Sequence, residues 1–236
     1  MRSSQIEVDG IAVEIVRKKI KNLHLRVSPP AGRVRVSAPL RVDDAVVREL
    51  VNARLDWILD HQSRIAARPL RPRLELVSGE QVDYLGDSYR LNVCAVAGRP
   101  RVELVERTLH LLVPPGSDRA QRMAVLECWY RRQLKELIPP RLRHWERVLD
   151  VEAAQWGVKR MKTRWGTCNI GARRIWLNLA LIRQPAVCLD YILVHELTHL
   201  LERGHNARFR QLMDRFLPQW RHPDALLRKC SLRDEA

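Results

Sequence analysis

The sequence of 236 residues lacks three features that would each assign it to a definite class of protein. No apolar run is long enough to span a bilayer, and the longest candidate, 189–201, is interrupted at His195, Glu196 and His199. No apolar signal-peptide stretch follows Met1. The five cysteines are odd in number and form no C-x-x-C pair, which argues against a disulfide framework and against a cysteine-based zinc site. We therefore expect a cytoplasmic protein with no membrane partner.

Positive charge is in excess. The chain has 42 Lys and Arg against 27 Asp and Glu, a formal net charge of +15. A positive electrostatic potential of this kind favours the binding of polyanions, whether nucleic acid, nucleotide phosphates or an acidic peptide. The same composition is also typical of a highly charged solvated surface. The charge of this basic protein therefore suggests partners without selecting one.

The N-terminal part is expected to be β-rich. Alternating apolar and polar residues predict two hairpins, one turning at Asp9-Gly10 and the other around 29–32. Helical spacing of apolar residues over 46–58 then predicts a single helix. The segment 67–73 lacks periodicity, carries two prolines and is the best candidate linker. We therefore expect an N-terminal domain of hairpins and a helix over residues 1–66.

The remaining residues, 74–236, are expected to form a second domain with its active core at about 155–220. A β region over 74–113 is followed by a helix over 118–137, and Pro139-Pro140 predicts the start of another helix. Strands, a proline turn and a helix thus occur twice in the chain, as a diverged duplication would produce. Two further strands are expected over 158–164 and 174–181, then an apolar helix over 186–201 and a final helix from Asn206.

The helix expected over 186–201 carries the motif H-E-x-x-H, from His195 to His199. Residues four apart lie on one face of a helix, so both imidazoles can reach one ion. Glu196 is displaced by about 100° around the helix, where it can accept a proton from a hydrolytic water beside the ion. Histidines and a carboxylate on an apolar helix are costly to bury unless they are mutually satisfied, and a metal satisfies them.

A third ligand is needed to leave one position open for water. His205 is the favoured candidate, and Glu202 is the rival. An unbroken helix would turn His205 about 120° away from His199. We therefore predict that the helix ends first, with Gly204 in the left-handed conformation that commonly ends helices, and that Asn206 caps the next helix.

Two further features suggest substrate contacts. On the strand expected over 158–164, Arg160, Lys162 and Arg164 would share one face and Trp165 the other. This pattern fits a substrate-facing edge, and it also fits an ordinary amphipathic strand. Tyr191, one turn before His195, is a candidate oxyanion stabiliser or a core tyrosine.

Several segments resemble the YgjP-like metallopeptidase family, which is related to the SprT-like zinc proteases. These are R-W-G-T-C at 164–168, I-W-L-N at 175–178, and Y-I-L-V-H-E-L-T-H-L at 191–200 with His205 and Phe209 beyond it. The likeness covers most of the chain, with Thr167 where the family usually has serine. It implies an α+β fold, in which a β-rich N-terminal part precedes a small zincin-like core with H-E-x-x-H on a buried helix. It also implies that His195, His199 and His205 are zinc ligands and Glu196 the catalytic carboxylate.

Three functions fit these observations. The leading one is a zinc peptidase acting on peptides or proteins, for which another divalent metal is an alternative cofactor. The second is a metal-dependent nucleotide phosphohydrolase of the nucleoside triphosphate pyrophosphatase type, with Arg160, Lys162 and Arg164 among the cations available to a polyphosphate. The third is a DNA-associated SprT-like protease that uses its basic surface, although no nucleic-acid-binding motif is evident.

Overall fold

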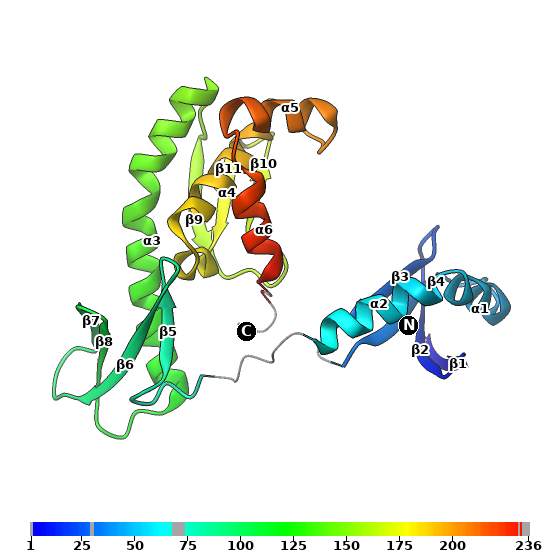
Figure 1. The fold of residues 1–236 in the computed structure, drawn as a ribbon, viewed down its shortest axis with the longest axis horizontal. Coiled ribbons are helices and arrows are strands. Elements are labelled where there is room, and N and C mark those ends of the chain that lie inside the picture. Colours follow the sequence, from blue (N-terminus) through cyan, green and yellow to red (C-terminus); the bar gives the residue numbers. More distant parts are fainter. Residues whose placement is uncertain (1, 29–30, 68–73, 231, 233–236) are drawn as a thin grey trace. The chain divides into compact units, whose positions relative to one another are not determined.

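The computed structural model describes residues 2–28, 31–67, 74–230 and 232. The chain forms two compact units, Met1–Arg71 and Pro72–Ala236 (Figure 1). The linker predicted over 67–73 lies, apart from Ala67, outside the described residues, as do Pro29 and Pro30 of the second hairpin turn. None of the helices in the described ranges is both long and apolar enough to cross a membrane.

The first unit contains a four-stranded sheet whose strands follow the order β1-β2-β4-β3. The strands are β1 (Arg2–Val8), β2 (Ile11–Lys18), β3 (His24–Ser28) and β4 (Arg33–Pro39). The two predicted hairpins are confirmed as the antiparallel pairs β1–β2 and β3–β4, while β2 runs parallel to β4. Asp9 and Gly10 have φ of 47° and 76°, the positive values that a tight two-residue hairpin turn requires.

Two helices follow this sheet, where the sequence predicted one. They are α1 (Asp44–Asn52) and α2 (Leu55–Ala66). The single-helix prediction is wrong because the backbone leaves the helical path at Arg54, with φ of −124° and ψ of 16°. Of the apolar positions behind that prediction, Val47, Val51 and Ile58 are fully buried in the core of this unit, whereas Val46 and Trp57 are exposed.

The second unit begins with a sheet of the same topology. Its strands are β5 (Gln81–Tyr84), β6 (Asp87–Ala95), β7 (Arg101–Val105) and β8 (Thr108–Val113), in the order β5-β6-β8-β7. As in the first unit, the outer pairs are antiparallel and the central pair is parallel. The repeat noticed in the sequence therefore extends to strand order and direction.

A single long helix, α3 (Arg119–Leu149), follows this sheet (Figure 1). It begins with a capping box formed by Asp118 and Gln121. The prediction that Pro139 and Pro140 start a new helix is wrong. A proline inside a helix costs about 3 kcal/mol. Burying a leucine or isoleucine stabilises by roughly 1.5–3 kcal/mol, and a buried row of such residues continues across the prolines: Leu134, Ile138 and Leu142.

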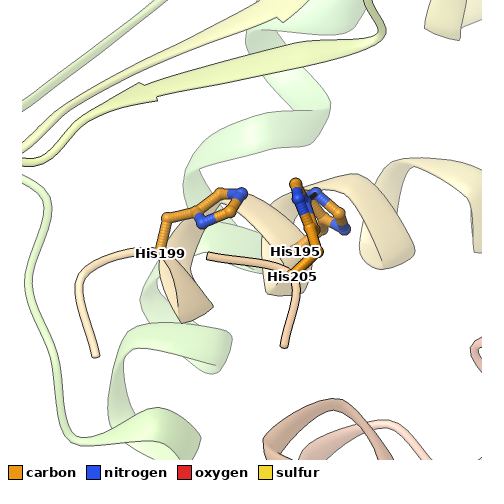
Figure 2. Close-up of side chains that lie close together, drawn as sticks. All are labelled: His195, His199 and His205. Atoms are coloured by element: carbon orange, nitrogen blue, oxygen red, sulfur yellow. Dashed lines mark hydrogen bonds between the residues drawn. The ribbon is translucent and has the colours of Figure 1, made fainter. Parts of the chain in front are cut away.

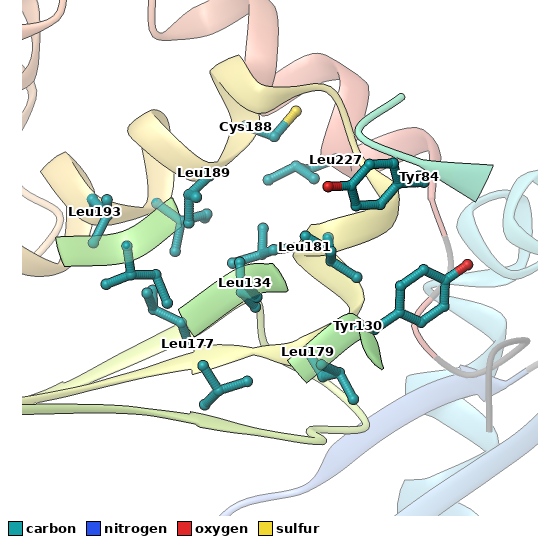
Figure 3. Packing of buried hydrophobic residues seen from close by; sticks show 14 of the residues in the cluster. Tyr84, Tyr130, Leu134, Leu177, Leu179, Leu181, Cys188, Leu189, Leu193 and Leu227 are labelled. Carbon is teal, nitrogen blue, oxygen red and sulfur yellow. The ribbon is translucent and has the colours of Figure 1, made fainter. Parts of the chain in front are cut away.

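A three-stranded sheet and four helical segments complete the second unit. The strands are β9 (Gln155–Lys159), β10 (Gly166–Asn169) and β11 (Arg174–Asn178), in the order β10-β11-β9, so β10 is an edge strand. The helical segments are η1 (Leu179–Arg183), α4 (Ala186–Thr198), α5 (Ala207–Phe216) and α6 (Arg221–Lys229). Figure 3 shows leucines from α3, β11, η1, α4 and α6 meeting in one core. The expected α+β fold is confirmed, and α6 was not expected.

The strand predicted over 158–164 ends at Lys159. The following residues curl into a loop that the buried side chain of Asn178 holds in place. Its Nδ2 donates to the carbonyl oxygens of Met161 and Arg164 over 2.8 and 2.7 Å. The predicted row of Arg160, Lys162 and Arg164 on one strand face is therefore wrong, because contacts with a residue far along the chain outweigh the local alternating pattern.

The first sheet of the second unit supports the segment that leads into α4. The backbone N–H of Leu85 donates to the carbonyl of Ile182 over 2.8 Å, and that of Gly86 to the carbonyl of Arg183 over 3.2 Å. Gly86 lies so close to Pro185 that a Cβ there would be 2.7 Å from the proline ring. The hairpin turn between β5 and β6 thereby fixes the start of α4.

Candidate metal centre

Helix α4 presents His195 and His199 one turn apart on the same side. The helix is apolar and largely buried, and Glu196, only 5% exposed, is among its buried residues. His199 is the C-cap residue, with φ of −64° and ψ of −17°, so it still follows the helical path. The spacing predicted from the motif is therefore present in the structure.

The chain reverses between His199 and His205, as a third ligand from this segment requires. The helix ends at Thr198, whose carbonyl oxygen accepts from the backbone N–H groups of Leu201 and Glu202 in the turn that follows. The prediction that a left-handed Gly204 ends the helix is wrong, because its φ is not positive and the helix has ended six residues earlier. Asn206 caps α5 as expected, with its side chain accepting from the N–H of Phe209.

The three imidazoles converge (Figure 2). One ring nitrogen from each of His195, His199 and His205 lies within 4.8 Å of the others, and the Nε2 atoms of His195 and His205 are 2.9 Å apart. Two ligands of a tetrahedral zinc at about 2.0–2.1 Å would be roughly 3.3 Å apart. A small ring rotation is therefore enough for these nitrogens to share an ion. Phe209 packs against all three rings at 4.7–5.0 Å between centroids.

The surroundings of His195 and His199 favour their neutral forms, as metal ligation requires. Burial and the two neighbouring histidines lower the pKa of His195 to about 4. Burial also lowers the pKa of His199. The Nδ1 of His199 lies 3.2 Å from the carbonyl oxygen of Glu202, which only accepts, so Nδ1 carries the proton and Nε2 keeps its lone pair. Glu202, the rival ligand, contributes its backbone here, while its carboxylate accepts from the N–H of Gly204.

Glu196 lies in the wall of the same pocket, against the edge strand. A Cβ on Gly166 of β10 would be 2.6 Å from its Oε1, so glycine leaves the space that this carboxylate occupies. Burial raises the pKa of Glu196 to about 8, and the nearby charge of Arg164 opposes that rise. A cation held by the neighbouring histidines would lower the pKa again.

The pocket around these groups has a volume of about 570 Å³. Of the predicted substrate contacts, Arg164, Trp165 and Tyr191 border it together with the histidines and Glu196. Arg160 and Lys162 border a separate, smaller pocket, where Arg160 forms a 3.0 Å ion pair with Glu127. The structure therefore brings together three of the five predicted contacts.

Helix α6 contributes residues that the sequence did not single out. Asp224 accepts from the hydroxyl of Tyr191 over 3.0 Å and from Nε of Arg228 over 2.8 Å, and both Asp224 and Arg228 border the metal pocket. Burial and Asp224 raise the pKa of Tyr191. The one available signal was the i, i+4 pair of Asp224 and Arg228, which is common on ordinary helices.

Cys168 of β10 also borders the pocket. Burial and the charge of Glu196 raise the pKa of its thiol to about 11. A thiol with a raised pKa is a poor nucleophile at neutral pH, which argues against Cys168 as a nucleophile.

One comparison with known proteins identifies the family of this chain. The family model of the YgjP-like metallopeptidase domain matches residues 21–230, which include all three histidines and Glu196. The chain is similar to the crystal structure of the metallopeptidase zymogen of Pyrococcus abyssi abylysin, with 20% identity over 39% of this chain and 93% of that one, and a TM-score of 0.36. No curated protein matches the sequence.

Proposed function

Because this chain belongs to the YgjP-like metallopeptidase family, we propose that its metal is zinc, held by His195, His199 and His205, and that Glu196 is the general base. The observation that carries the proposal is the convergence of three imidazoles beside one buried carboxylate. Three nitrogen ligands with one position left open are typical of catalytic zinc. Other divalent metals that accept imidazole also fit this donor set.

In this proposal the metal ion, Glu196 and strand β10 have different roles in peptide hydrolysis. When bound, a zinc ion would polarise the scissile carbonyl and acidify a water molecule. Glu196 takes the proton from the attacking water and later delivers it to the leaving amine as the C–N bond breaks. The open edge of β10 gives an extended peptide backbone hydrogen-bonding groups beside Glu196. These residues and this edge strand support our proposal that the protein is a zinc peptidase.

The metal assignment is tested by measuring bound zinc. We expect the wild-type protein to retain about one equivalent after dialysis and the His205→Ala variant to lose it, because two imidazoles alone do not complete such a site. The matched control is His222→Ala, which removes an exposed histidine of α6. Equal zinc in wild type and His205→Ala would contradict the assignment of the third ligand.

The reaction is tested with two substrate classes. The zinc-loaded protein and a Glu196→Gln variant are incubated with denatured casein and with a panel of nucleoside triphosphates. We expect casein cleavage that is lost in the variant, because the amide cannot accept the proton. Pyrophosphate release that depends on Glu196, with casein left intact, would replace the peptidase proposal with the nucleotide phosphohydrolase.

A further inference from the structure

A second pocket lies along the opposite side of β10 and shares its rim with the metal pocket. It has a volume of about 780 Å³. Residues from β10, β11 and the loops on either side border it, and Arg164, Thr167 and Arg203 border both pockets. A substrate held beside Glu196 can therefore extend into this second pocket without leaving the surface of the protein.

Three arginines border this second pocket. Arg164 comes from the loop before β10, Arg174 from the start of β11, and Arg203 from the loop that carries His205. Within the described part of the chain, none of the three forms an ion pair or a side-chain hydrogen bond. Nε of Arg174 is buried and has no hydrogen-bond partner. Arginines nearby differ in having a carboxylate partner: Arg160 with Glu127, Arg173 with Glu152, Arg208 with Glu202, and Arg228 with Asp224.

The strand register shows which ligand geometry this pocket suits. Thr167 pairs with Trp176 and Asn169 with Arg174, so these side chains share the face of the sheet opposite the buried Ile175 and Leu177. A strand added to the edge of β10 would place alternate side chains on this same face. The remaining side chains would point toward α4 and the metal centre.

Trp176 borders the second pocket, and its ring already contacts neighbouring residues. Nζ of Lys159 lies 3.6 Å from its ring centroid, and Gly157 provides the space in which the ring lies, since a Cβ there would overlap Trp176. Proteins that hold single-stranded nucleic acid use open aromatic faces as well as positive charge. The second pocket offers three arginines and one partly covered aromatic ring, which favours a compact anion over a nucleobase.

We propose that this pocket is a subsite for the carboxylate of an aspartate or glutamate side chain in a peptide bound along β10. The inference rests on the proposed peptidase function and adds to it a preference for acidic sequence on one side of the scissile bond. A carboxylate can accept paired hydrogen bonds from a guanidinium group, and Arg164, Arg174 and Arg203 have no carboxylate partner in the described part of the chain. Across the metal pocket, Arg228 is already neutralised by Asp224, which places the uncompensated positive charge on the β10 side.

The test uses pairs of peptides that are identical except for Glu or Gln at one position. That position is moved along the peptide from one pair to the next. Binding is measured by fluorescence anisotropy on the zinc-loaded Glu196→Gln protein, so that no cleavage is needed, and kcat/KM is measured on the active enzyme. We expect the Glu peptide to bind about tenfold more tightly at one position, the scale of one charge-assisted contact. Replacing both Arg174 and Arg203 with Gln should reduce that ratio to about twofold. The matched control, Arg173→Gln, removes the adjacent arginine that pairs with Glu152 and should keep the preference.

The outcomes separate this inference from the proposed function. Equal binding of the Glu and Gln peptides at every position, with Glu196-dependent cleavage intact, overturns the subsite and leaves the peptidase. A preference for Glu that depends on the arginines, with no peptide cleaved, supports the subsite and contradicts the peptidase. Nucleoside triphosphate binding that depends on Arg174 and Arg203, with no preference for the Glu peptide, overturns the subsite in favour of a phosphate ligand.

Discussion

Replacing Gly166 with alanine tests the position of Glu196, the proposed general base, without changing a proposed metal ligand. The added Cβ would lie 2.6 Å from Oε1 of Glu196, 2.8 Å from its Cγ and 2.8 Å from Cγ2 of Ile192. Ordinary contact begins at about 3.4 Å, so the carboxylate oxygen must move by about 0.8 Å. A displacement of about 1 Å in a catalytic group can cost about 100-fold in rate. We therefore expect kcat/KM to fall by about 100-fold, which corresponds to roughly 2.7 kcal/mol.

The assay measures cleavage of a fluorogenic peptide, bound zinc and thermal unfolding for the same preparations. Zinc content should match that of the wild type, because no histidine is displaced. Stability should fall by about 1–3 kcal/mol, the usual cost of overpacking. The control is Gly98→Ala, at a glycine with no atom within 4 Å of the added Cβ. A Gly166→Ala enzyme with wild-type activity and zinc content would refute the placement of Glu196 against β10.

Four further predictions follow from the same contacts. Asn178→Ala should reduce the free energy of unfolding, measured in urea, by about 2–4 kcal/mol. The substitution removes the buried amide that donates hydrogen bonds to the carbonyl oxygens of Met161 and Arg164. A change within error would mean that the loop over 160–165 does not depend on this side chain. Tyr191→Phe should cost about 1 kcal/mol of stability and leave kcat nearly unchanged, since the hydroxyl is directed to Asp224; a large loss of kcat would show instead that the hydroxyl reaches the substrate. Gly204→Ala should keep zinc and activity, because the φ angle of Gly204 is not positive and nothing lies within 4 Å of the added Cβ. Loss of zinc in this variant would instead support the left-handed conformation that the sequence suggested for Gly204. Iodoacetamide at pH 8 should modify the exposed Cys128 before Cys168 and Cys188, because burial raises the pKa values of those two thiols to about 11. The difference in labelling rate, measured by mass spectrometry, should narrow as the pH rises toward 11. Equal labelling of the three cysteines at pH 8 would contradict the burial of Cys168 and Cys188.

The convergence of the proposed metal ligands could be predicted because their geometry is local. The spacing of His195 and His199 fixes their common face as soon as the segment is helical. The reversal before His205 was also foreseen, but its cause was misassigned to Gly204. The turn actually forms around Thr198 and Glu202, through backbone hydrogen bonds to Thr198 and a hydrogen bond from the N–H of Gly204 to the Glu202 carboxylate.

The parts that could not be predicted depend on residues distant in the sequence. Alternating residues suggested a strand through Arg160, whereas the side chain of Asn178 holds that segment in a loop. Pro139 suggested a helix start, whereas burial of Ile138 and its neighbours keeps α3 continuous. The position of Asp224 beside Tyr191 depends on how α6 packs against α4, for which the sequence carries no signal.

The two apolar cores have no residue in common: one gathers the buried side chains of the first sheet with α1 and α2, and the other those of the second unit. Cooperative melting requires that losing part of a core destabilises the rest of it. Heating should therefore melt the protein in two calorimetric steps, and a chelator should shift only the step that belongs to the histidine-bearing unit.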